Sequence, residues 1–347
     1  MVVYCTREDV KSALDSAETA RSNAQVDRAI ETASRAIESL TLRRFYPTTA
    51  TRYFDWPDRN SSRPWRLWLN ADELISVTTL TVAGEAIAST DYFLEPANSG
   101  PPFTHVEIDL ASSAAFSSGD THQRAIAIAG VFGYQATSET VGSLSSNLDA
   151  DTTDTASVSW TRNVGIGDIL TIDNERVIVT DRTMVDTTQN LQADLAASVS
   201  GVTVAVTNGA AFLVGQILLV ESERMLVVDI AGNNLTVKRA WDGSVLAAHT
   251  SGADIYALTG IDIDRAQLGT TLAAHTTGAT ISRHVVPGPI RTLCIAEAIN
   301  TLLQEQAGWG RSVGSGESER AASGADLPGL RTEVRRQFGR RSRTAAV

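Results

Sequence analysis

The chain has 347 residues, of which 43% are hydrophobic and 20% are charged, and its formal net charge at pH 7 is −11. This length predicts about two domains, and the composition is that of a soluble globular protein, since no apolar run approaches the roughly 18 residues that span a bilayer. The acidic balance argues against a dedicated nucleic-acid-binding protein, whose surface usually carries a basic footprint. The first residues lack a basic segment followed by an apolar one, so we expect no secretory signal peptide and a cytoplasmic site of synthesis.

Two helices are predicted near the N-terminus. Thr6 and Asp9 form a capping box ahead of a short helix. The next helix has Asn23 as its candidate N-cap, and a stripe of apolar residues then recurs at helical spacing. Such a narrow stripe packs either on its own domain or on a neighbouring subunit. The stripe consists of Val26, Ile30, Ala33, Ile37 and Leu40.

The pattern changes to strands over residues 52–134. Aromatic or β-branched runs alternate there with Pro, Gly, Asn and Asp, which predicts a small antiparallel sheet beside the helices. Trp56, Trp65 and Trp68 are interpreted as core or subunit-contact residues, with a platform for sugars or bases as the alternative.

Residues 135–283 interrupt this pattern with a Thr-, Ser-, Val- and Asp-rich segment that repeats itself. Residues 167–180 align without gaps on residues 215–228, and residues 239–255 align on residues 265–281. Each copy of the first motif predicts a strand, a tight polar turn and a second strand. The two pairs start at different intervals, which indicates that one copy is nested within the other rather than placed in tandem.

No signature of a nucleophile elbow, zinc protease, P-loop or dinucleotide site occurs in the sequence. Cys5 and Cys294 lack redox or zinc-ligand spacing and are interpreted as buried or incidental thiols. His249 and His275 occupy equivalent places in the repeat, without a partner at ligand spacing, so a turn-stabilising or packing role is favoured over a metal site. We therefore expect no catalytic residues, no cofactor, no metal and no enzyme activity.

The helical pattern resumes after Pro289. Residues 290–303 predict a broadly apolar helix and residues 307–326 a mobile connection. A last short element starts at residues 327–330, and Leu330, Val334 and Phe338 recur in it four residues apart. Residues 331–343 contain six arginines against one glutamate. An isolated helix this short would be marginal in water, so we expect it to order against a partner.

Together these patterns predict an α+β protein with a discontinuous scaffold. Residues 1–134 and 284–347 are expected to form a helical scaffold with a small antiparallel sheet, whose C-terminal arm covers about residues 327–347. Residues 135–283 are expected to form an inserted all-β domain with an internal repeat.

This order of parts resembles the head-to-tail connector (adaptor) proteins of long-tailed bacteriophages. The resemblance rests on the two-helix start and on the segments WRLWLNADELISVTTLTVAG at 65–84, DYFLEP at 91–96, QRAIAIAGVFGY at 123–134 and VPGPIR at 286–291, followed by an apolar and an Arg-rich helix. It covers both scaffold segments, a little over half of the chain, and leaves the inserted β domain without a counterpart.

The resemblance implies a structural virion protein at the neck. Such adaptors form a ring, usually of twelve copies, beneath the portal protein, and pass the DNA channel on to the stopper and the tail. Double-stranded DNA would slide through the lumen without specific binding, which suits an acidic chain. The C-terminal segment of these proteins docks on the portal, with apolar anchors and with arginines facing carboxylates. The residues assigned to that docking are Leu330, Arg331, Val334, Arg335, Arg336, Phe338, Arg340 and Arg341.

Two other functions stay open at this point. A β-rich tail or surface protein would bind carbohydrate through Trp241 and other exposed aromatic residues of the insert. A nucleic-acid-binding protein would use the Arg-rich residues 331–347, and its affinity would fall steeply with salt.

Overall fold

The chain was analysed as a computed structural model, which describes residues 2–14, 22–57, 63–151, 155–159, 164–306, 312–313, 320–321 and 326–340. The protein is mostly β, with 37% of its residues in strands and 21% in helices. Three antiparallel sheets, one of them ten-stranded, and a two-stranded pair occur in these residues. The expected helical scaffold with a small sheet is therefore wrong, because more of the chain pairs into strands than forms helices, and the sheets have cores of their own.

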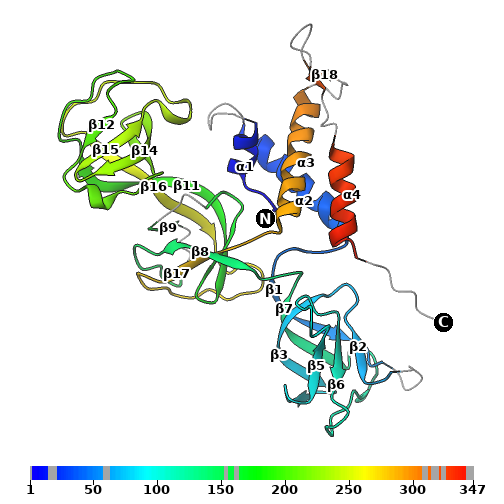
Figure 1. Ribbon diagram of the computed structural model, residues 1–347. Helices are drawn as coiled ribbons and strands as arrows, with labels where there is room; N and C mark the ends of the chain where they lie inside the picture. The colour runs from blue at the N-terminus through cyan, green and yellow to red at the C-terminus, as the bar shows by residue number, and fades with distance from the viewer. Residues whose placement is uncertain are drawn as a thin grey trace.

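The helical part of the chain is a module of four helices (Figure 1). These are α1 (Arg7–Ala13), α2 (Asn23–Thr41), α3 (Gly288–Gln306) and α4 (Leu327–Phe338). The predicted capping box is confirmed, since the Thr6 hydroxyl accepts from the Asp9 amide and the Asp9 carboxylate accepts from the Thr6 amide. Helix α2 begins one residue earlier than predicted, with Ser22 as the N-cap and Asn23 inside the helix.

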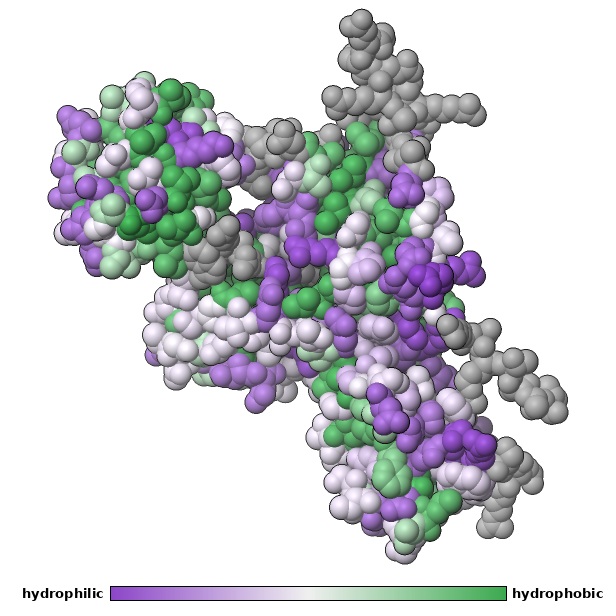
Figure 2. Space-filling model, in the orientation of Figure 1, coloured by the Kyte–Doolittle hydropathy of each residue, from purple (hydrophilic) through white to green (hydrophobic). Residues whose placement is uncertain are grey.

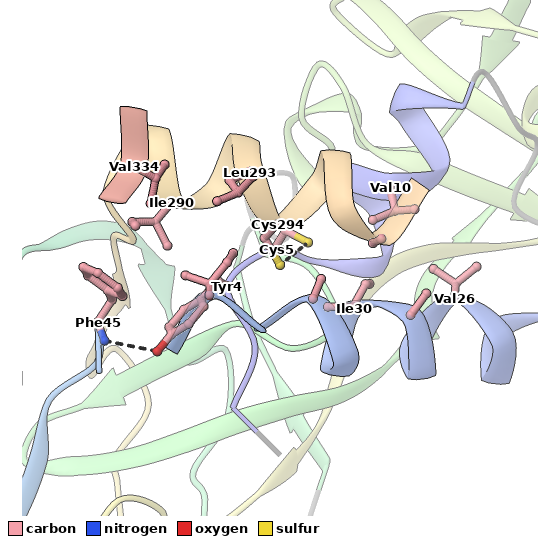
Figure 3. Close-up of a cluster of buried hydrophobic side chains, with 14 of the residues drawn as sticks. Tyr4, Cys5, Val10, Val26, Ile30, Phe45, Ile290, Leu293, Cys294 and Val334 are labelled. Carbon is pink, nitrogen blue, oxygen red and sulfur yellow. Dashed lines mark hydrogen bonds between the residues drawn. The ribbon is translucent and has the colours of Figure 1, made fainter. Parts of the chain in front are cut away.

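The core of the helical module joins the two ends of the chain. Val26 and Ile30 of α2 and Leu293 of α3 belong to this core, in which Val26 lies opposite Val10 and Tyr4 lies beside Phe45 (Figure 3). The Tyr4 hydroxyl accepts a hydrogen bond from the Phe45 amide and donates one to Glu38, so its polar end is satisfied inside the core. Burying each large aliphatic side chain stabilises the fold by about 1.5–3 kcal/mol. The packing of α2 on α3 is thus what joins the two segments.

A small β lobe follows α2 in the chain. One sheet has the order β1 (Thr48–Phe54), β7 (Ile126–Phe132), β3 (Leu74–Val82) and β4 (Glu85–Ile87), and another has the order β2 (Arg66–Trp68), β6 (His105–Ile108) and β5 (Tyr92–Glu95). Burial alternates along β7, as expected for a strand with one face on the core. The core of this lobe includes Phe54, Leu67, Leu69, Leu74, Leu80, Val106, Ile126, Ile128 and Phe132.

The inserted segment forms the ten-stranded sheet, with the order β12-β15-β14-β13-β16-β11-β10-β17-β8 and with β9 paired to β16. Its strands are β8 (Ser138–Ser143), β9 (Thr155–Ser157), β10 (Ile169–Ile172), β11 (Glu175–Asn190), β12 (Thr203–Ala205), β13 (Ile217–Val220), β14 (Glu223–Ala231), β15 (Asn234–Lys238), β16 (Asp254–Asp264) and β17 (Thr280–His284). Short 3-10 turns occur at η1 (Gly209–Ala211) and η2 (Trp241–Gly243), and β18 (Ser312–Val313) pairs with β19 (Arg320–Ala321).

This sheet folds around two separate cores, which define a proximal and a distal lobe. The proximal lobe has Leu170, Ile172, Val177, Val179, Ile261, Ile263 and Ile281 in its core. The distal lobe has Leu218, Val220, Met225, Val227, Leu235, Val237, Ile255 and Ala257. Strands β11 and β16 run through both lobes, so the chain enters the distal lobe along β11 and returns along β16 (Figure 1). The second copy of the repeat therefore lies inside the first.

The proximal lobe is joined to the helical module by packing and by hydrogen bonds. Ile169 and Ile178 belong to the core of the helical module. The Arg7 amide donates to the Ile166 carbonyl at 3.3 Å, and the Ile166 amide donates to Oε2 of Glu8 at 2.9 Å. The proximal lobe of the insert thus packs directly on the helical module, while the distal lobe lies at the far end of the molecule (Figure 1).

Candidate functional site

Helix α4 carries most of the residues assigned to docking, and its apolar side faces the chain itself. Val334 is buried in the core of the helical module, and Leu330 and Phe338 are partly buried against it. The Phe338 ring meets Phe45 and Tyr134 edge to face, each at 5.7 Å between ring centroids. In the single chain, these three side chains therefore hold α4 against α2 and α3.

The arginines of α4 point elsewhere. Arg331 forms an ion pair with Glu297 of α3, with Nη2 and Oε2 at 2.7 Å, and Arg336 pairs with Glu333 one turn earlier in the helix. Arg335 is exposed. The Arg340 amide donates to the Thr41 carbonyl at 3.0 Å, while Arg341 lies outside the described residues. Arg331, Arg335 and Arg336 are all exposed, and the first and last of them are paired with carboxylates; we call these three residues the basic α4 face.

The stripe of α2 faces its own domain. Val26, Ile30, Ala33 and Ile37 are buried, and Leu40 packs against the same core. Their neighbours on α3 include Leu293, Ala298 and Leu302. Of the two placements left open by the sequence, the structure shows packing within the chain.

Two cysteines that are 289 residues apart in the sequence meet in this core (Figure 3). Their Sγ atoms lie 3.2 Å apart, and both side chains are buried. Contact with Cys294 and burial raise the pKa of the Cys5 thiol, which keeps it protonated near neutral pH. Neither cysteine has a local motif, so nothing in the sequence pointed to the pair.

The repeat places a buried polar cluster in each lobe of the insert. In the distal lobe, Glu223 accepts a bidentate pair of hydrogen bonds from Arg239, both at 2.7 Å. Nε2 of His249 lies 2.9 Å from the same carboxylate, and its Nδ1 lies 2.8 Å from Glu221. The Ala247 carbonyl accepts from Arg239, which fixes the loop after η2.

The proximal lobe repeats this cluster with the equivalent residues of the other copy. Glu175 accepts from Arg265 at 2.9 and 2.8 Å, and Nε2 of His275 lies 3.0 Å away. Nδ1 of His275 lies 2.8 Å from Asp173, the position of Glu221 in the other lobe. The acidic partners were missed by the sequence analysis, although an acid-x-Glu-Arg motif is visible in both aligned segments.

The two buried glutamates stay ionised in their clusters. Burial alone would raise the pKa of Glu223, but hydrogen bonds from Arg239, from the Ala247 and Ala240 amides and from His249 outweigh it and lower the pKa to about 2. The same balance, with Arg265 and His275 as the leading donors, lowers the pKa of Glu175 to about 2. Each charge is compensated by direct partners, so the clusters are arranged to fix loops.

Neither cluster is a metal centre in the described residues, where no three His, Cys, Asp or Glu side chains are placed to hold an ion. His249 and His275 instead anchor the loops that lead into β16 and β17. Asp262 accepts from the Thr155 hydroxyl at 2.9 Å. The polar groups of the insert thus serve its own folding.

The aromatic residues considered as platforms are engaged within the chain. Nε1 of Trp56 donates to the Phe116 carbonyl at 3.0 Å, and Trp65 packs on the core of the small β lobe. Trp68 lies against His105, with ring centroids 4.2 Å apart. The ammonium of Lys238 lies 4.7 Å from the centre of the Trp241 ring.

A pocket of about 220 Å³ lies where α2 meets the small β lobe. Its charged lining is balanced, because three arginines face three carboxylates. Nε of Arg43 lies 3.0 Å from Oε1 of Glu73, and Arg52 pairs with Asp72. Arg44 and Glu38 complete the charged lining. The lining residues therefore carry no net charge among themselves, and Nη2 of Arg340 lies 3.8 Å from Oε1 of Glu73.

The chain matches no protein-family model and no curated protein sequence. In the described part of the chain, no helix combines the length and the apolar character needed to cross a membrane.

Proposed function

We propose that this protein is a non-catalytic assembly protein, a head-to-tail connector that forms a ring under a phage portal and passes the DNA channel on to a stopper or tail. One observation supports this proposal above the others. Helices α1 and α2 of the first scaffold segment and helices α3 and α4 of the second meet in one helical module despite the inserted β segment. The split scaffold that the resemblance requires is thus physically coherent.

The contacts of α4 limit which of its residues are available to bind the portal. Leu330, Val334 and Phe338 already pack on α2 and α3, so docking through them would require α4 to leave its site. The basic α4 face can be reached while α4 stays in place, although Arg331 and Arg336 would exchange Glu297 and Glu333 for new carboxylates. We therefore propose that Arg331, Arg335 and Arg336 meet carboxylates of the portal while α4 stays on its own module.

The decisive experiment is a symmetry-resolved cryo-EM map of virions that carry this chain. The proposal expects a ring of this chain, of about twelve copies as in similar connectors, directly below the portal, with the basic α4 face at the contact. Presence only at the tail tip or on the capsid surface would overturn it.

A binding assay with the purified portal tests the basic α4 face. Replacing Arg335 and Arg336 by Glu should weaken binding at least about tenfold, because two attractive charges become repulsive. Arg124→Glu makes the same type of charge change at an exposed site on the small β lobe and should leave binding unchanged. Equal binding by all variants would exclude the basic α4 face as the contact.

A further inference from the structure

The first residues of the chain bind the helical module to the proximal lobe. The Ile166 amide donates to Oε2 of Glu8, and the Ile166 carbonyl accepts from the Arg7 amide. Nη1 of Arg182 lies 3.6 Å from Oε1 of Glu8. Hydrophilic residues also lie on the visible surface where the proximal lobe meets the helical module (Figure 2). Residues 2–9 therefore connect two parts of the fold, and we call them the N-terminal strap.

A cavity of about 40 Å³ lies between the N-terminal strap and the proximal lobe, and charged side chains from both sides line it. Asp9 of the strap accepts two hydrogen bonds from Arg291 of α3, at 2.9 and 2.6 Å. Asp168 of the proximal lobe is held less closely, because Nη1 of Arg283 lies 3.6 Å from its Oδ2. Arg283 also pairs with Glu139 of β8. Two carboxylates thus share this cavity, and the guanidinium groups beside them are divided unequally.

The distal lobe carries a neutral residue at the position of Asp168. By the repeat alignment, this residue is Gln216. The carboxyl of Asp168 accepts from the Gly165 amide at 2.8 Å, and the side-chain carbonyl of Gln216 accepts from the Leu213 amide at 3.0 Å. The two turns are therefore held in the same way. A neutral side chain is sufficient for this hydrogen bond, so the turn does not require the charge of Asp168.

The charged form of Asp168 is disfavoured while the strap is closed. Burial raises the pKa of Asp168 to about 6, although Arg283 and the Gly165 amide oppose the rise. The negative charges of Asp9 and Glu8 add to it. When the strap opens and water reaches the carboxyl, the pKa falls towards its usual value of about 3.9. The closed state then binds more protons than the open state, so closure becomes more favourable as the pH falls from above 6 towards 4.

The other titratable groups at the cavity act differently. Burial lowers the pKa of His284, so protonation of this residue at low pH would oppose closure rather than favour it. Burial raises the pKa of Tyr4, and contact with Cys294 raises that of Cys5, so both stay neutral near pH 7. Only a variant that changes Asp168 alone separates its effect from that of the histidine.

We propose that Asp168 is a pH-sensitive switch that closes the N-terminal strap when its carboxyl is protonated and loosens it when the carboxyl is ionised. The protonated carboxyl can keep the hydrogen bond to Gly165, as Gln216 keeps its counterpart, and it adds no charge beside Asp9 and Glu8. The ionised carboxyl brings a negative charge into the closed interface, which costs free energy that opening recovers. The helical module and the insert are thus coupled more tightly in mildly acidic than in neutral solution. This switch does not depend on a role in phage assembly.

Hydrogen exchange of residues 2–13, measured by mass spectrometry on the full chain and corrected for the intrinsic exchange rate, tests the switch. Between pH 7.5 and pH 5, the opening equilibrium of the wild-type strap should fall about tenfold relative to that of Asp168→Asn. The introduced asparagine keeps an acceptor for the Gly165 amide and has no charge, so this variant should fold and lack the pH dependence. Asp264→Asn makes the same charge change at an exposed site of the same lobe and should behave as the wild type.

Three outcomes would overturn the proposal. The first is the same pH dependence in the wild type and in Asp168→Asn. The second is a wild-type strap that opens more at pH 5 than at pH 7.5 relative to the variant, which would mean that the ionised carboxylate holds the interface through Arg283. The third is an equal effect of Asp264→Asn, which would assign the pH dependence to the overall charge of the lobe. A connector ring seen in the virion together with any of these results would leave the proposed function standing and remove only the switch.

Discussion

Glu175 and Glu223 show what a buried charge requires in this protein. Each carboxylate is fully buried, and each accepts from an arginine, a histidine and two backbone amides. An isolated carboxylate could not stay ionised at such a buried site, because no direct partner would offset the free-energy cost of removing it from water. The arginine and histidine come from a loop distant in sequence. The ionised glutamate therefore ties that loop to the hairpin on which it lies.

The stability of the insert should depend on pH through the carboxylates of Glu175 and Glu223. Their pKa is about 2 in the folded chain, whereas an unfolded glutamate has a pKa of about 4.3. A depressed folded pKa contributes stability that is complete above about pH 4.3 and is lost as the pH falls towards 2. Hydrogen exchange measured by mass spectrometry between pH 5 and pH 2, corrected for the intrinsic exchange rate, should show β13 and β14 losing protection below about pH 4.3.

The matched variants are Glu223→Gln and Glu221→Gln. Removing the buried charge leaves Arg239 with carbonyl acceptors but without its carboxylate, and should destabilise the distal lobe by about 3–5 kcal/mol at neutral pH. Glu221 is largely exposed, so its loss should matter little. Equal effects of the two substitutions would show that the buried cluster does not hold the lobe together.

Oxidation of the Cys5 and Cys294 thiols is expected to change the stability of the helical module. A two-electron thiol oxidant such as diamide should convert them into a disulfide, each thiol losing one hydrogen to the reagent. The bond would close a loop of most of the chain and is expected to stabilise the helical module by about 2–4 kcal/mol. Intact mass, free-thiol titration and the thermal midpoint would report the change.

Cys294→Ser provides the control for the oxidation. This variant should show no gain in thermal midpoint with the oxidant, and its Cys5 should remain a titratable thiol in denaturant. A wild type that keeps both thiols after partial unfolding and refolding with the oxidant would rule out the predicted bond.

At the scale of the element, α4 depends on tertiary contacts more than on its own helical propensity. It has 12 residues, and no side chain caps its N-terminus. Phe338→Ala should remove the ring contacts to Phe45 and Tyr134 and weaken the attachment of α4 by about 2 kcal/mol. Faster amide exchange in residues 327–338 would show the loss.

Arg335→Ala is the control on the exposed side of the same helix, and it should leave that exchange rate unchanged. If both substitutions accelerated exchange equally, the stability of α4 would come from the helix itself rather than from its apolar face. The basic α4 face could then bind a partner only together with a loosened helix.

Local periodicity predicted the elements better than their assembly. The stripe of α2 and the apolar run after Pro289 both became helices, because helical spacing is a property of neighbouring residues. The fold class was wrong because sheet membership depends on distant pairing, as in β11 with β16. The Cys5 and Cys294 contact and the partners of Glu223 escaped prediction for the same reason, although the repeat already contained the aligned acids.

At the scale of the whole molecule, nesting predicts which parts can be removed. Asn190 at the end of β11 and Asp254 at the start of β16 are register partners, so the distal lobe leaves and rejoins the proximal lobe at one point. Replacing residues 191–253 by a two-residue Asn-Gly turn should therefore give a β-hairpin that closes the proximal lobe. Amide protection of α2 and β10 should match that of the full chain.

Removal of the entire insert should have a different effect. Its ends also lie close together, since Ser138 of β8 pairs with His284 of β17, so a short linker can close a chain lacking residues 135–283. It would nevertheless lose Ile169 and Ile178 from the helical core, which should reduce its free energy of unfolding by about 3 kcal/mol or more. Urea unfolding of the two deletion variants measures the loss of stability in each. If the shorter deletion were destabilised as much as the longer one, the distal lobe would be part of the folding unit rather than a nested addition to it.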